Sequence, residues 1–425
     1  MKVLVIGSGG REHAICYKLN QSSRVEKIYA VPGNAGMAKI AQCIDVKIGE
    51  EQYFEKIKEI VEKEKVDLTF VGPEIPLVDG IVNYFNDNGL KIFGPSKEAA
   101  LIEGSKIFAK EFMDRHGIPT PNYKVFEESK YAFAYIKGHE YPLVVKYDGL
   151  AAGKGVFICK NEEEATQAIS SVLDEKIFGR DNQKIIIENF EKGQEISLLA
   201  FSDGHNVACM PSSQDHKRIF DGDKGPNTGG MGAYSPFPLV GTQLLKEIKN
   251  KILFPTIQGL KDEGRLYVGV LYLGLIKNKD EVKVLEYNVR LGDPEAQVIL
   301  PRLETDLTEV VEACLSESIN EANIKWNSKS CLCVVLASEG YPGSYKKGKE
   351  IKGLDIEDQI DDLIIFHAGT KIEEDKIVTN GGRVLGITAL GEDIFKAKEK
   401  AYQAIKKIYF EGVQYRSDIG DKAYA

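Results

Sequence analysis

The first hundred residues alternate short apolar runs with helical patterns, and this alternation limits the possible folds more than any other feature. Strand-like runs occupy residues 2–6, 27–31, 67–71 and 91–93, and helical patterns occupy residues near 11–20, 51–64 and 76–88. This order predicts a parallel sheet flanked by helices. The turn after each strand contains glycine or proline, and such sheets bind ligands at the carboxyl ends of their strands. We therefore expect the four turns to form the rim of a pocket.

The chain has 425 residues, which is too long for one hydrophobic core. A helical pattern from about 95 to 116 is followed by Gly-Ile-Pro-Thr-Pro, which is typical of a linker. We expect an α/β multi-domain protein that begins with a parallel α/β domain and ends with short strands and a closing helix. The expected domains are 1–121, 122–192, 193–325 and 326–425.

Composition excludes several classes of protein. The net charge of −9 argues against a general nucleic-acid binder, because phosphate contacts require a basic surface. No apolar run reaches the roughly 18 residues of a membrane span, and the N-terminal apolar run is too short for a secretion signal. Seven scattered cysteines predict a reduced, cytoplasmic protein, with Cys331 and Cys333 in a core. Nothing requires more than a monomer.

Residues 284–297 (sequence VLEYNVRLGDPEAQ) carry the clearest chemistry. Alternation along a strand places Glu286, Asn288 and Arg290 on one face, about 7 Å apart. Mg²⁺ prefers oxygen ligands, and arginine binds anionic oxygens with two nitrogens. This face therefore suits metal-bound nucleotide phosphate, although a solvated edge strand is the alternative. The other face is the expected core face, with Leu285, Tyr287, Val289 and Leu291.

Residues 7–13 (sequence GSGGREH) form a glycine turn before a helix. A dinucleotide fingerprint requires glycine where Glu12 stands, and the next strand ends in Pro-Gly-Asn rather than in an acidic residue. NAD is therefore not expected. The turn suits a single phosphate with Arg11 nearby, and a purely structural turn is the alternative.

Residues 146–155 (sequence KYDGLAAGKG) join two predicted strands. The glycines allow backbone N–H groups to point at phosphate oxygens, and Lys146 and Lys154 add positive charge. The spacing is not that of a Walker loop. We expect a mobile lid over a nucleotide, with a solvated hairpin as the alternative.

Two further segments and one missing motif complete the pattern. Residues 188–191 suit a hinge beside an adenine, and the long polar loop over 213–219 and 225–234 suits a substrate loop. The chain has no G-x-S-x-G motif and no metal-ligand spacing among its histidines. The implied chemistry is phosphoryl transfer, in which positioning and charge neutralisation do most of the catalysis.

These segments, in this order, resemble the ATP-grasp superfamily and, within it, the phosphoribosylamine–glycine ligase family. Residues 290–297 (RLGDPEAQ) are similar to that family's signature. Further similar blocks lie at 7–13, 71–77, 103–106, 148–155, 213–218, 225–236, 366–371 and 381–385. The resemblance implies a pre-ATP-grasp N-terminal domain, an ATP-grasp domain with a mobile lid subdomain, and a small C-terminal α+β domain.

The resemblance also implies an activity and its cofactors, ATP and Mg²⁺ or Mn²⁺. Glycine and 5-phosphoribosylamine would be joined through glycyl phosphate, giving glycinamide ribonucleotide, ADP and phosphate in purine biosynthesis. The implied ATP contacts are Lys106, Lys146, Gly153, Lys154, Gly155, Glu188, Asn189, Phe190, Glu191 and Glu195. The implied metal ligands are Glu286 and Asn288. The implied substrate contacts are Gly9, Gly10, Asp215, Lys217 and Arg290, and the implied catalytic residues are Arg290, Asp215 and Asp293.

The chain departs from the wider superfamily at one position. Many members carry a further metal-binding carboxylate on the preceding strand, where this chain has Tyr272. A second metal ion would therefore depend on ATP oxygens and water for its ligands. Two other functions remain open from the sequence: a different ATP-grasp ligase of a carboxylate and an amine, or a nucleotide-binding protein without catalysis.

Overall fold

The computed structural model describes residues 1–151, 153–179 and 183–424. Its N-terminal part contains a five-stranded parallel sheet of order β3-β2-β1-β4-β5, as predicted. The strands are β1 (Lys2–Gly7), β2 (Lys27–Pro32), β3 (Gln42–Cys43), β4 (Leu68–Val71) and β5 (Ile92–Phe93). The sequence did not indicate β3, because two residues carry no measurable alternation. The carboxyl ends of β1 and β2 lie side by side, which places their glycine turns together.

The helices predicted near 11–20 and 51–64 are confirmed, whereas the two other predicted helices are each divided in two. They are α1 (Gly10–Asn20), α2 (Tyr53–Glu64), α3 (Glu74–Asp79), α4 (Ile81–Asp87), α5 (Lys97–Gly104) and α6 (Lys106–Arg115). A single helix near 76–88 was wrong, because Gly80 adopts φ +103° and separates α3 from α4. A single helix over 95–116 was also wrong. Ser105 is extended there, and its side chain accepts a hydrogen bond from the Phe108 N–H, so that α6 begins anew at Lys106.

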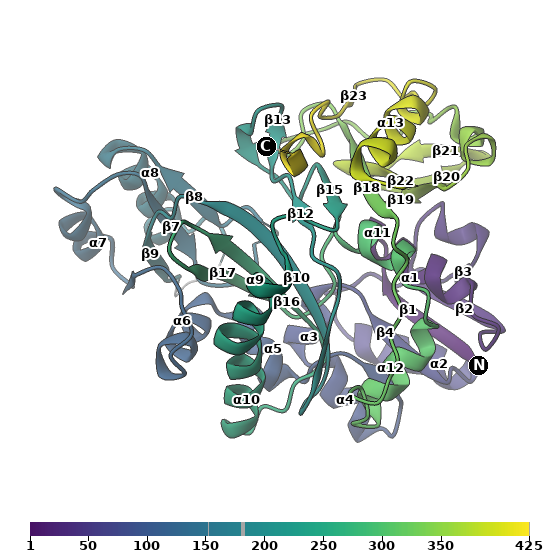
Figure 1. Ribbon diagram of the computed structural model, residues 1–425, viewed down its shortest axis with the longest axis horizontal. Coiled ribbons are helices and arrows are strands. Elements are labelled where there is room, and N and C mark those ends of the chain that lie inside the picture. Colours follow the sequence, from purple (N-terminus) through teal and green to yellow (C-terminus); the bar gives the residue numbers. More distant parts are fainter. Residues whose placement is uncertain (152, 180–182, 425) are drawn as a thin grey trace.

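A four-stranded antiparallel sheet of order β6-β9-β7-β8 follows and projects to one side of the molecule (Figure 1). Its strands are β6 (Tyr123–Phe126), β7 (Leu143–Tyr147), β8 (Val156–Cys159) and β9 (Ile185–Asn189), with helices α7 (Ser129–Ile136) and α8 (Glu162–Leu173). The sheet and helices enclose a separate cluster of buried apolar side chains. We call this unit the lid. Its independent core is consistent with movement as one body.

The central sheet has the order β11-β10-β16-β17 and carries the predicted site strand at its edge. Its strands are β10 (Gln194–Asp203), β11 (Val207–Cys209), β16 (Val268–Lys277) and β17 (Val282–Asn288). The associated helices are α9 (Thr242–Ile248), a π-helical turn (Lys249–Leu253), α10 (Phe254–Asp262), α11 (Ala296–Ile299) and α12 (Leu307–Leu315). The long strand pair β10–β16 lies between the lid and the C-terminal part (Figure 1).

The C-terminal sheet recruits strands from the substrate loop. Its order is β12-β15-β18-β22-β19, and β23 pairs with β18. The strands are β12 (Gln214–Asp215), β15 (Gly232–Ser235), β18 (Ser330–Ser338), β19 (Leu363–His367), β22 (Arg383–Gly391) and β23 (Val413–Gln414). Hairpins β13–β14 (Arg218–Phe220, Lys224–Asn227) and β20–β21 (Thr370–Glu373, Lys376–Thr379) and helix α13 (Ile394–Ile405) complete it. Strand pairing therefore crosses the expected boundary at 325, which remains a prediction.

The seven cysteines are free thiols, and Cys331 and Cys333 are fully buried, as expected. Within the described ranges, the helices are too short or too polar to span a lipid bilayer.

Candidate active site

A β-bulge in β17 sets the positions of the predicted site residues. Gly274 lies opposite Glu286, whereas Leu275 lies opposite Val284, so Leu285 is an extra residue in β17. A bulge shifts the alternation of side chains by one position. The prediction that Leu285 faces the core is therefore wrong, because that side chain is only partly buried and Val284 is fully buried instead.

The other half of the predicted pattern is confirmed. Beyond the bulge, Tyr287, Val289 and Leu291 are buried. Glu286 and Asn288 remain partly exposed on the opposite side. The polar face predicted from residues 286 and 288 therefore exists. The bulge and the pairing with β16 decide which side of the strand it occupies.

The bulge also presents two neighbouring carbonyl groups to other segments. The carbonyl of Val284 accepts a hydrogen bond from Thr120 Oγ1 at 2.8 Å, and the carbonyl of Leu285 accepts one from Lys146 Nζ at 3.0 Å. The Val284 N–H donates to the Pro119 carbonyl at 2.8 Å. The linker and the lid strand β7 thus both dock on the bulge, which brings Lys146 close to Glu286.

Glu286 faces positive charges from three segments. Lys217, which follows β12, places its Nζ 3.5 Å from Glu286 Oε1. Partial burial alone would raise the pKa of Glu286, but Lys217, Lys146, Lys106 and Arg290 outweigh burial and lower the pKa to about 2. Several cations therefore converge on this carboxylate, as expected where a polyphosphate binds.

Lys106 and Lys217 are each held by a further partner near Glu286. Lys106 Nζ donates to the Gly149 carbonyl of the glycine-rich loop at 2.8 Å, and burial lowers its pKa. Lys217 Nζ also lies 3.0 Å from Glu195 Oε2. Lys217 thus bridges Glu195, the residue implied for the ATP ribose, and Glu286, the residue implied for the metal.

A buried ion triad that the sequence reasoning missed supports Lys146. Glu188 Oε2 lies 2.9 Å from Lys146 Nζ, and Glu188 Oε1 lies 3.2 Å from Lys110 Nζ. Burial lowers the pKa of Lys110 to about 8. Lys110 also donates to Thr120 Oγ1 at 2.6 Å. The signal for Lys110 was its i+4 spacing from Lys106 on one helix face.

The remaining residues implied for ATP lie at the edge of the lid. Asn189 is exposed, and Glu191 Oε1 lies 2.7 Å from Lys283 Nζ. Phe190 is partly buried. In the glycine-rich loop, Gly153 adopts φ +78° beside the Thr228 carbonyl. Lys154 in this loop is exposed and Gly155 is buried, and position 152 lies outside the described residues.

Arg290 is enclosed by acidic partners that the sequence did not assign to it. Its Nε lies 3.1 Å from Glu74 Oε2, and one terminal nitrogen lies 3.2 Å from Glu103 Oε1. That terminal nitrogen also donates to Asn288 Oδ1 at 2.9 Å. Burial raises the pKa of Glu103 to about 7 despite the attraction of Arg290. Glu74 behaves differently, because Arg290 and Arg11 outweigh its burial and lower the pKa to about 2.

The glycine turn before α1 lies against the segment after β17. A side-chain carbon added at Gly10 would lie 2.3 Å from Gln297 Nε2, and one at Gly9 would lie 3.2 Å from Asp293 Oδ2. A side chain at position 10 would therefore displace the Gln297 amide group. The Gly9 N–H already donates to Glu12 Oε2 at 2.6 Å.

Asp215 lies near Glu295, Lys217 and Arg383. Burial and the nearby Glu295 raise its pKa well above the ordinary value, although Lys217 and Arg383 oppose the shift. Glu295 Oε1 accepts hydrogen bonds from Ser197 Oγ at 2.9 Å and from the Tyr272 hydroxyl at 3.0 Å. Tyr272, which was expected near the position of a further metal ligand, belongs to this hydrogen-bond network.

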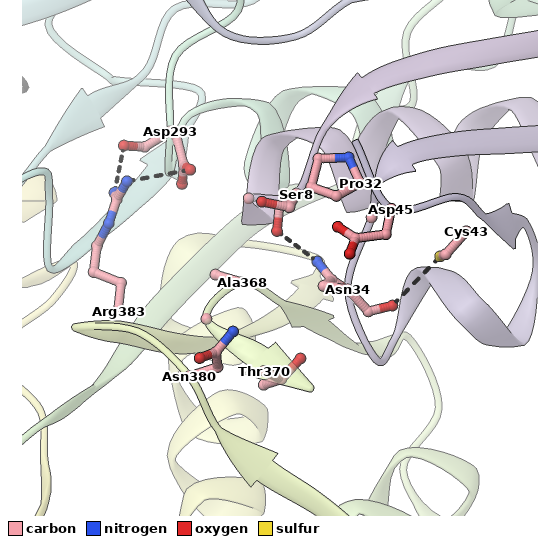
Figure 2. Close-up of a pocket in the computed structure, with 13 residues that line it drawn as sticks. Ser8, Pro32, Asn34, Cys43, Asp45, Asp293, Ala368, Thr370, Asn380 and Arg383 are labelled. Carbon is pink, nitrogen blue, oxygen red and sulfur yellow. Dashed lines mark hydrogen bonds and ion pairs between the residues drawn. The ribbon is translucent and has the colours of Figure 1, made fainter. Parts of the chain in front are cut away.

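A cavity of about 600 Å³ opens where the N-terminal and C-terminal sheets meet (Figure 2). Its lining residues are Ser8, Gly9, Pro32, Gly33, Asn34, Cys43, Asp45, Asp293, Ala368, Gly369, Thr370, Asn380 and Arg383. The turns after β1 and β2 therefore form part of a pocket rim, as predicted. The turn after β5 was wrongly included, because Pro95 packs against Gly269.

Arg383 is the functional candidate in this cavity that the sequence reasoning did not single out. It projects from β22 toward Asp293 (Figure 2), with a terminal nitrogen 3.2 Å from Asp293 Oδ2 and another donating to the Asp293 carbonyl at 2.7 Å. On the opposite wall, Asn34 Nδ2 donates to the Ser8 carbonyl at 2.9 Å. Block 381–385 was noted for its resemblance, but no local pattern indicated a pocket residue.

Glu286 and Asn288 are the oxygen donors expected to hold a cation, and Lys217 and Arg290 contact them in this structure. Across the described residues, no group of three histidine, cysteine, aspartate or glutamate side chains is arranged to hold a metal ion. A hard cation at this pair would therefore need further oxygen atoms from nucleotide and water. The two donors fit such a shared site.

Comparison with known proteins agrees with this architecture. Three family models match the chain: the phosphoribosylglycinamide synthetase N domain over residues 1–103, its ATP-grasp (A) domain over 104–296 and its C domain over 331–422. A phosphoribosylamine–glycine ligase from Caldanaerobacter subterraneus subsp. tengcongensis is 50% identical over 419 residues, which cover 99% of each chain. One from Halalkalibacterium halodurans is 48% identical and covers 100% of this chain and 98% of that one.

A solved structure shows the same arrangement of domains. The crystal structure of a phosphoribosylamine–glycine ligase from Thermotoga maritima has a TM-score of 0.84 and 35% sequence identity, covering 99% of this chain and 100% of that chain. Family models, relatives and structure agree from one end of the sequence to the other. This chain belongs to the phosphoribosylglycinamide synthetase family, whose members include the phosphoribosylamine–glycine ligases.

Proposed function

We propose that this chain joins glycine to 5-phosphoribosylamine at the expense of ATP, giving glycinamide ribonucleotide, ADP and phosphate. Its relatives are named for this ligation. The observation that carries the proposal is the position of Glu286 among Lys106, Lys146 and Lys217, which come from three separate segments. Phosphoryl transfer depends on positioning and on neutralisation of charge, and this arrangement supplies both.

Glu286 and Asn288 would hold a divalent cation, Mg²⁺ or Mn²⁺. The cation would neutralise phosphate charge when bound. Lys106 and Lys146, whose charges act on Glu286, would bind the phosphates, while Glu195 and the 188–191 segment would bind the nucleoside. The half-exposed setting of Glu286 leaves room for these ligands.

The reaction would proceed in two displacements. A carboxylate oxygen of glycine attacks the γ-phosphorus of ATP, which breaks the bond to the ADP oxygen and gives glycyl phosphate. The amine of phosphoribosylamine then attacks the activated carbonyl carbon, loses a proton and expels phosphate. Asp215 is the group that we assign to accept the proton, because burial and Glu295 raise its pKa.

Arg290 would assist the first displacement by contact with the transferring phosphoryl group. Its nitrogens now bind Glu74, Glu103 and the Asn288 amide oxygen. The terminal nitrogen shared between Glu103 and Asn288 is the donor that we assign to the phosphoryl oxygen. The glycine-rich loop would close over this point and exclude water, since water would hydrolyse glycyl phosphate.

The cavity beside β22 would take 5-phosphoribosylamine. Asp45 and Asp293 supply acceptors for hydroxyl and amine groups, and Arg383 supplies positive charge for phosphate. The Gly9 end of the cavity lies next to the α1 N-terminus, where backbone N–H groups favour an anion. Arg383, which lies near both Asp293 and Asp215, would place the amine near the activated glycine. We further propose a monomer in the cytoplasm, as the composition suggests.

Isotope transfer tests the chemistry directly. The chain is incubated with ATP, Mg²⁺, phosphoribosylamine and glycine carrying ¹⁸O in both carboxylate oxygens. We expect ADP release only when both acceptor substrates are present, and one ¹⁸O atom in each phosphate formed. ADP release with another acid and amine pair would instead favour a different ligase, and absence of label in phosphate would exclude glycyl phosphate. ATP binding without turnover would indicate a binding protein.

A further inference from the structure

A buried arginine near the end of the chain holds the β13–β14 hairpin. The Arg416 side chain has no exposed surface. Its Nε and one terminal nitrogen bind the two carboxylate oxygens of Asp418, each at 2.7 Å. The other terminal nitrogen donates to Asp223 Oδ1 at 3.0 Å and to the Arg218 carbonyl at 3.1 Å. One guanidinium therefore joins the C-terminal tail to the turn between β13 and β14 and to the start of β13.

Further bonds strengthen the same junction. Asp418 Oδ2 accepts a hydrogen bond from the Gly222 N–H at 2.8 Å, and Asp221 Oδ1 accepts one from the Ser417 N–H at 2.8 Å. Lys422 forms an ion pair with Asp223. We call residues 416–418 together with 218 and 221–223 the tail latch. The attraction of Arg416 and these hydrogen bonds lower the pKa of Asp418 against the opposing effect of burial.

The tail side of the latch is fixed to the C-terminal core. The Tyr402 hydroxyl of α13 donates to the Arg416 carbonyl at 2.6 Å and accepts from the Ile419 N–H at 3.2 Å. Ile419 is fully buried. The latch is therefore a rigid anchor rather than a free chain end.

The hairpin side of the latch leads directly to the active site. Arg218, whose carbonyl Arg416 holds, is the next residue after Lys217. At the other end of the hairpin, the Thr228 N–H and Oγ1 each donate to the Lys217 carbonyl at 2.8 Å. The Lys217 carbonyl is thus held by the residue that follows β14, and its chain neighbour Arg218 is held by Arg416. Its Nζ lies between Glu195 and Glu286.

We propose that Arg416 is a positioning residue that sets the place of the Lys217 ammonium group, an inference that rests on the proposed function. Lysine has a flexible stem, so its backbone position and its partners decide where the charge lies. Arginine is suited to the latch because a planar guanidinium can bind one carboxylate with two nitrogens and still reach two further acceptors. The C-terminal tail is in this way part of the catalytic apparatus.

A double-mutant cycle on the full chain tests this coupling. We expect Arg416→Gln to lower kcat about 10-fold and Lys217→Met about 100-fold, since a displacement of about 1 Å in a catalytic site is worth up to that much. If Arg416 acts through Lys217, the double variant has the kcat of Lys217→Met alone. Asp421→Asn, which removes a surface partner of Lys398 in the same tail, is the matched control and keeps kcat.

Three results would overturn the proposal. The first is multiplication of the two losses in the double variant, which indicates an independent structural role. The second is an unchanged kcat in Arg416→Gln. The third is an unchanged kcat in Lys217→Met, which refutes the role of Lys217 in the proposed function itself and so is a distinct failure. If Arg416→Gln folds poorly by circular dichroism, Asp223→Asn carries the same cycle, because it weakens the contact between Arg416 and the hairpin and retains the pair of Arg416 with Asp418.

Discussion

The two ends of the segment from Glu286 to Arg290 are built in opposite ways. At one end a single carboxylate faces cations from α6, the lid and the substrate loop, and its side chain is 34% exposed. At the other end a single guanidinium, 16% exposed, is bound by Glu74 and Glu103 of the N-terminal part. The cations at the first end lie in a partly open site that can take a further anion, whereas the charge of the guanidinium at the second end is already compensated within the protein.

The two ends therefore suit different roles: the Glu286 end suits ligand binding, and the Arg290 end positions β17. Several cations in a partly open site attract a polyphosphate, because the ligand adds negative charge near them. A buried cation with two carboxylates attracts no anion until it exchanges a partner, and it ties the end of β17 to the N-terminal domain. Removing one member of such a group leaves an uncompensated buried charge. Substitutions at the two ends should therefore have different consequences.

The largest effect is expected at the Arg290 end. Arg290→Met should lower turnover about 1,000-fold if Arg290 contacts the phosphoryl group. It should also lower the free energy of unfolding by about 3–5 kcal/mol, because Glu74 and Glu103 lose their shared partner. Steady-state ADP release and urea unfolding measure the two losses. Arg115→Met, at an exposed ion pair with Glu263, is the control and should cost at most about 1 kcal/mol. Turnover near that of the parent chain would remove Arg290 from the mechanism.

The next largest effect is expected at the Glu286 end. Glu286→Gln should lower turnover about 100-fold at limiting Mg²⁺, because the cation loses a charged ligand while the lysines remain. Titration of ADP release with Mg²⁺ measures the change, and a chelator should abolish activity in the parent chain. Glu281→Gln near the other end of β17 is the control. An unchanged Mg²⁺ dependence in Glu286→Gln would show that the cation binds elsewhere.

A smaller effect is expected at Lys110, which shares the partner Glu188 with Lys146. Lys110→Met should raise the KM for ATP about 10-fold, since Glu188 would lose a partner and Lys146 would shift. The KM for glycine should stay the same. Lys124→Met, an exposed lysine in the neighbouring strand β6, serves as the control. A rise in the KM for glycine alone would contradict the placement of Lys110 beneath the nucleotide.

The smallest effect is a pH dependence of stability at the Arg290 end, caused by its partner Glu103. Burial raises the pKa of Glu103 from 4.5 to about 7, so the folded chain binds this proton more tightly than the unfolded chain. This group's contribution is therefore full below about pH 4.5 and is lost as pH rises to about 7. Glu103→Gln should flatten that part of the stability curve, measured by urea unfolding across pH.

Glu74→Gln provides the opposite case. The pKa of Glu74 is lowered to about 2, so its contribution is present above about pH 4.5 and is lost as pH falls toward 2. The variant should keep the slope between pH 4.5 and 7 and lose the acid limb. Identical curves for both variants would show that the two carboxylates do not titrate separately.

The sequence allowed much of the fold and part of the site to be predicted. The parallel N-terminal sheet, the β7–β8 hairpin and the polar face at Glu286 follow from patterns within a few residues. Gly80 and Ser105 show the limit of such patterns, because helical periodicity continues through both while the backbone turns. Leu285 shows a second limit, since a bulge depends on the partner strand and on the segments that bind its carbonyl groups.

The sequence by itself determined the order of strands and helices, the glycine turns and the chemical identity of the residues in the site, because these depend on neighbours along the chain. Only the tertiary structure decided which charges meet. Arg290 finds Glu74, Lys146 finds Glu188, and Arg416 finds Asp223 across long separations in sequence. The physical reason is that ion pairs and strand register depend on distance in space, and folding alone brings these distant segments together.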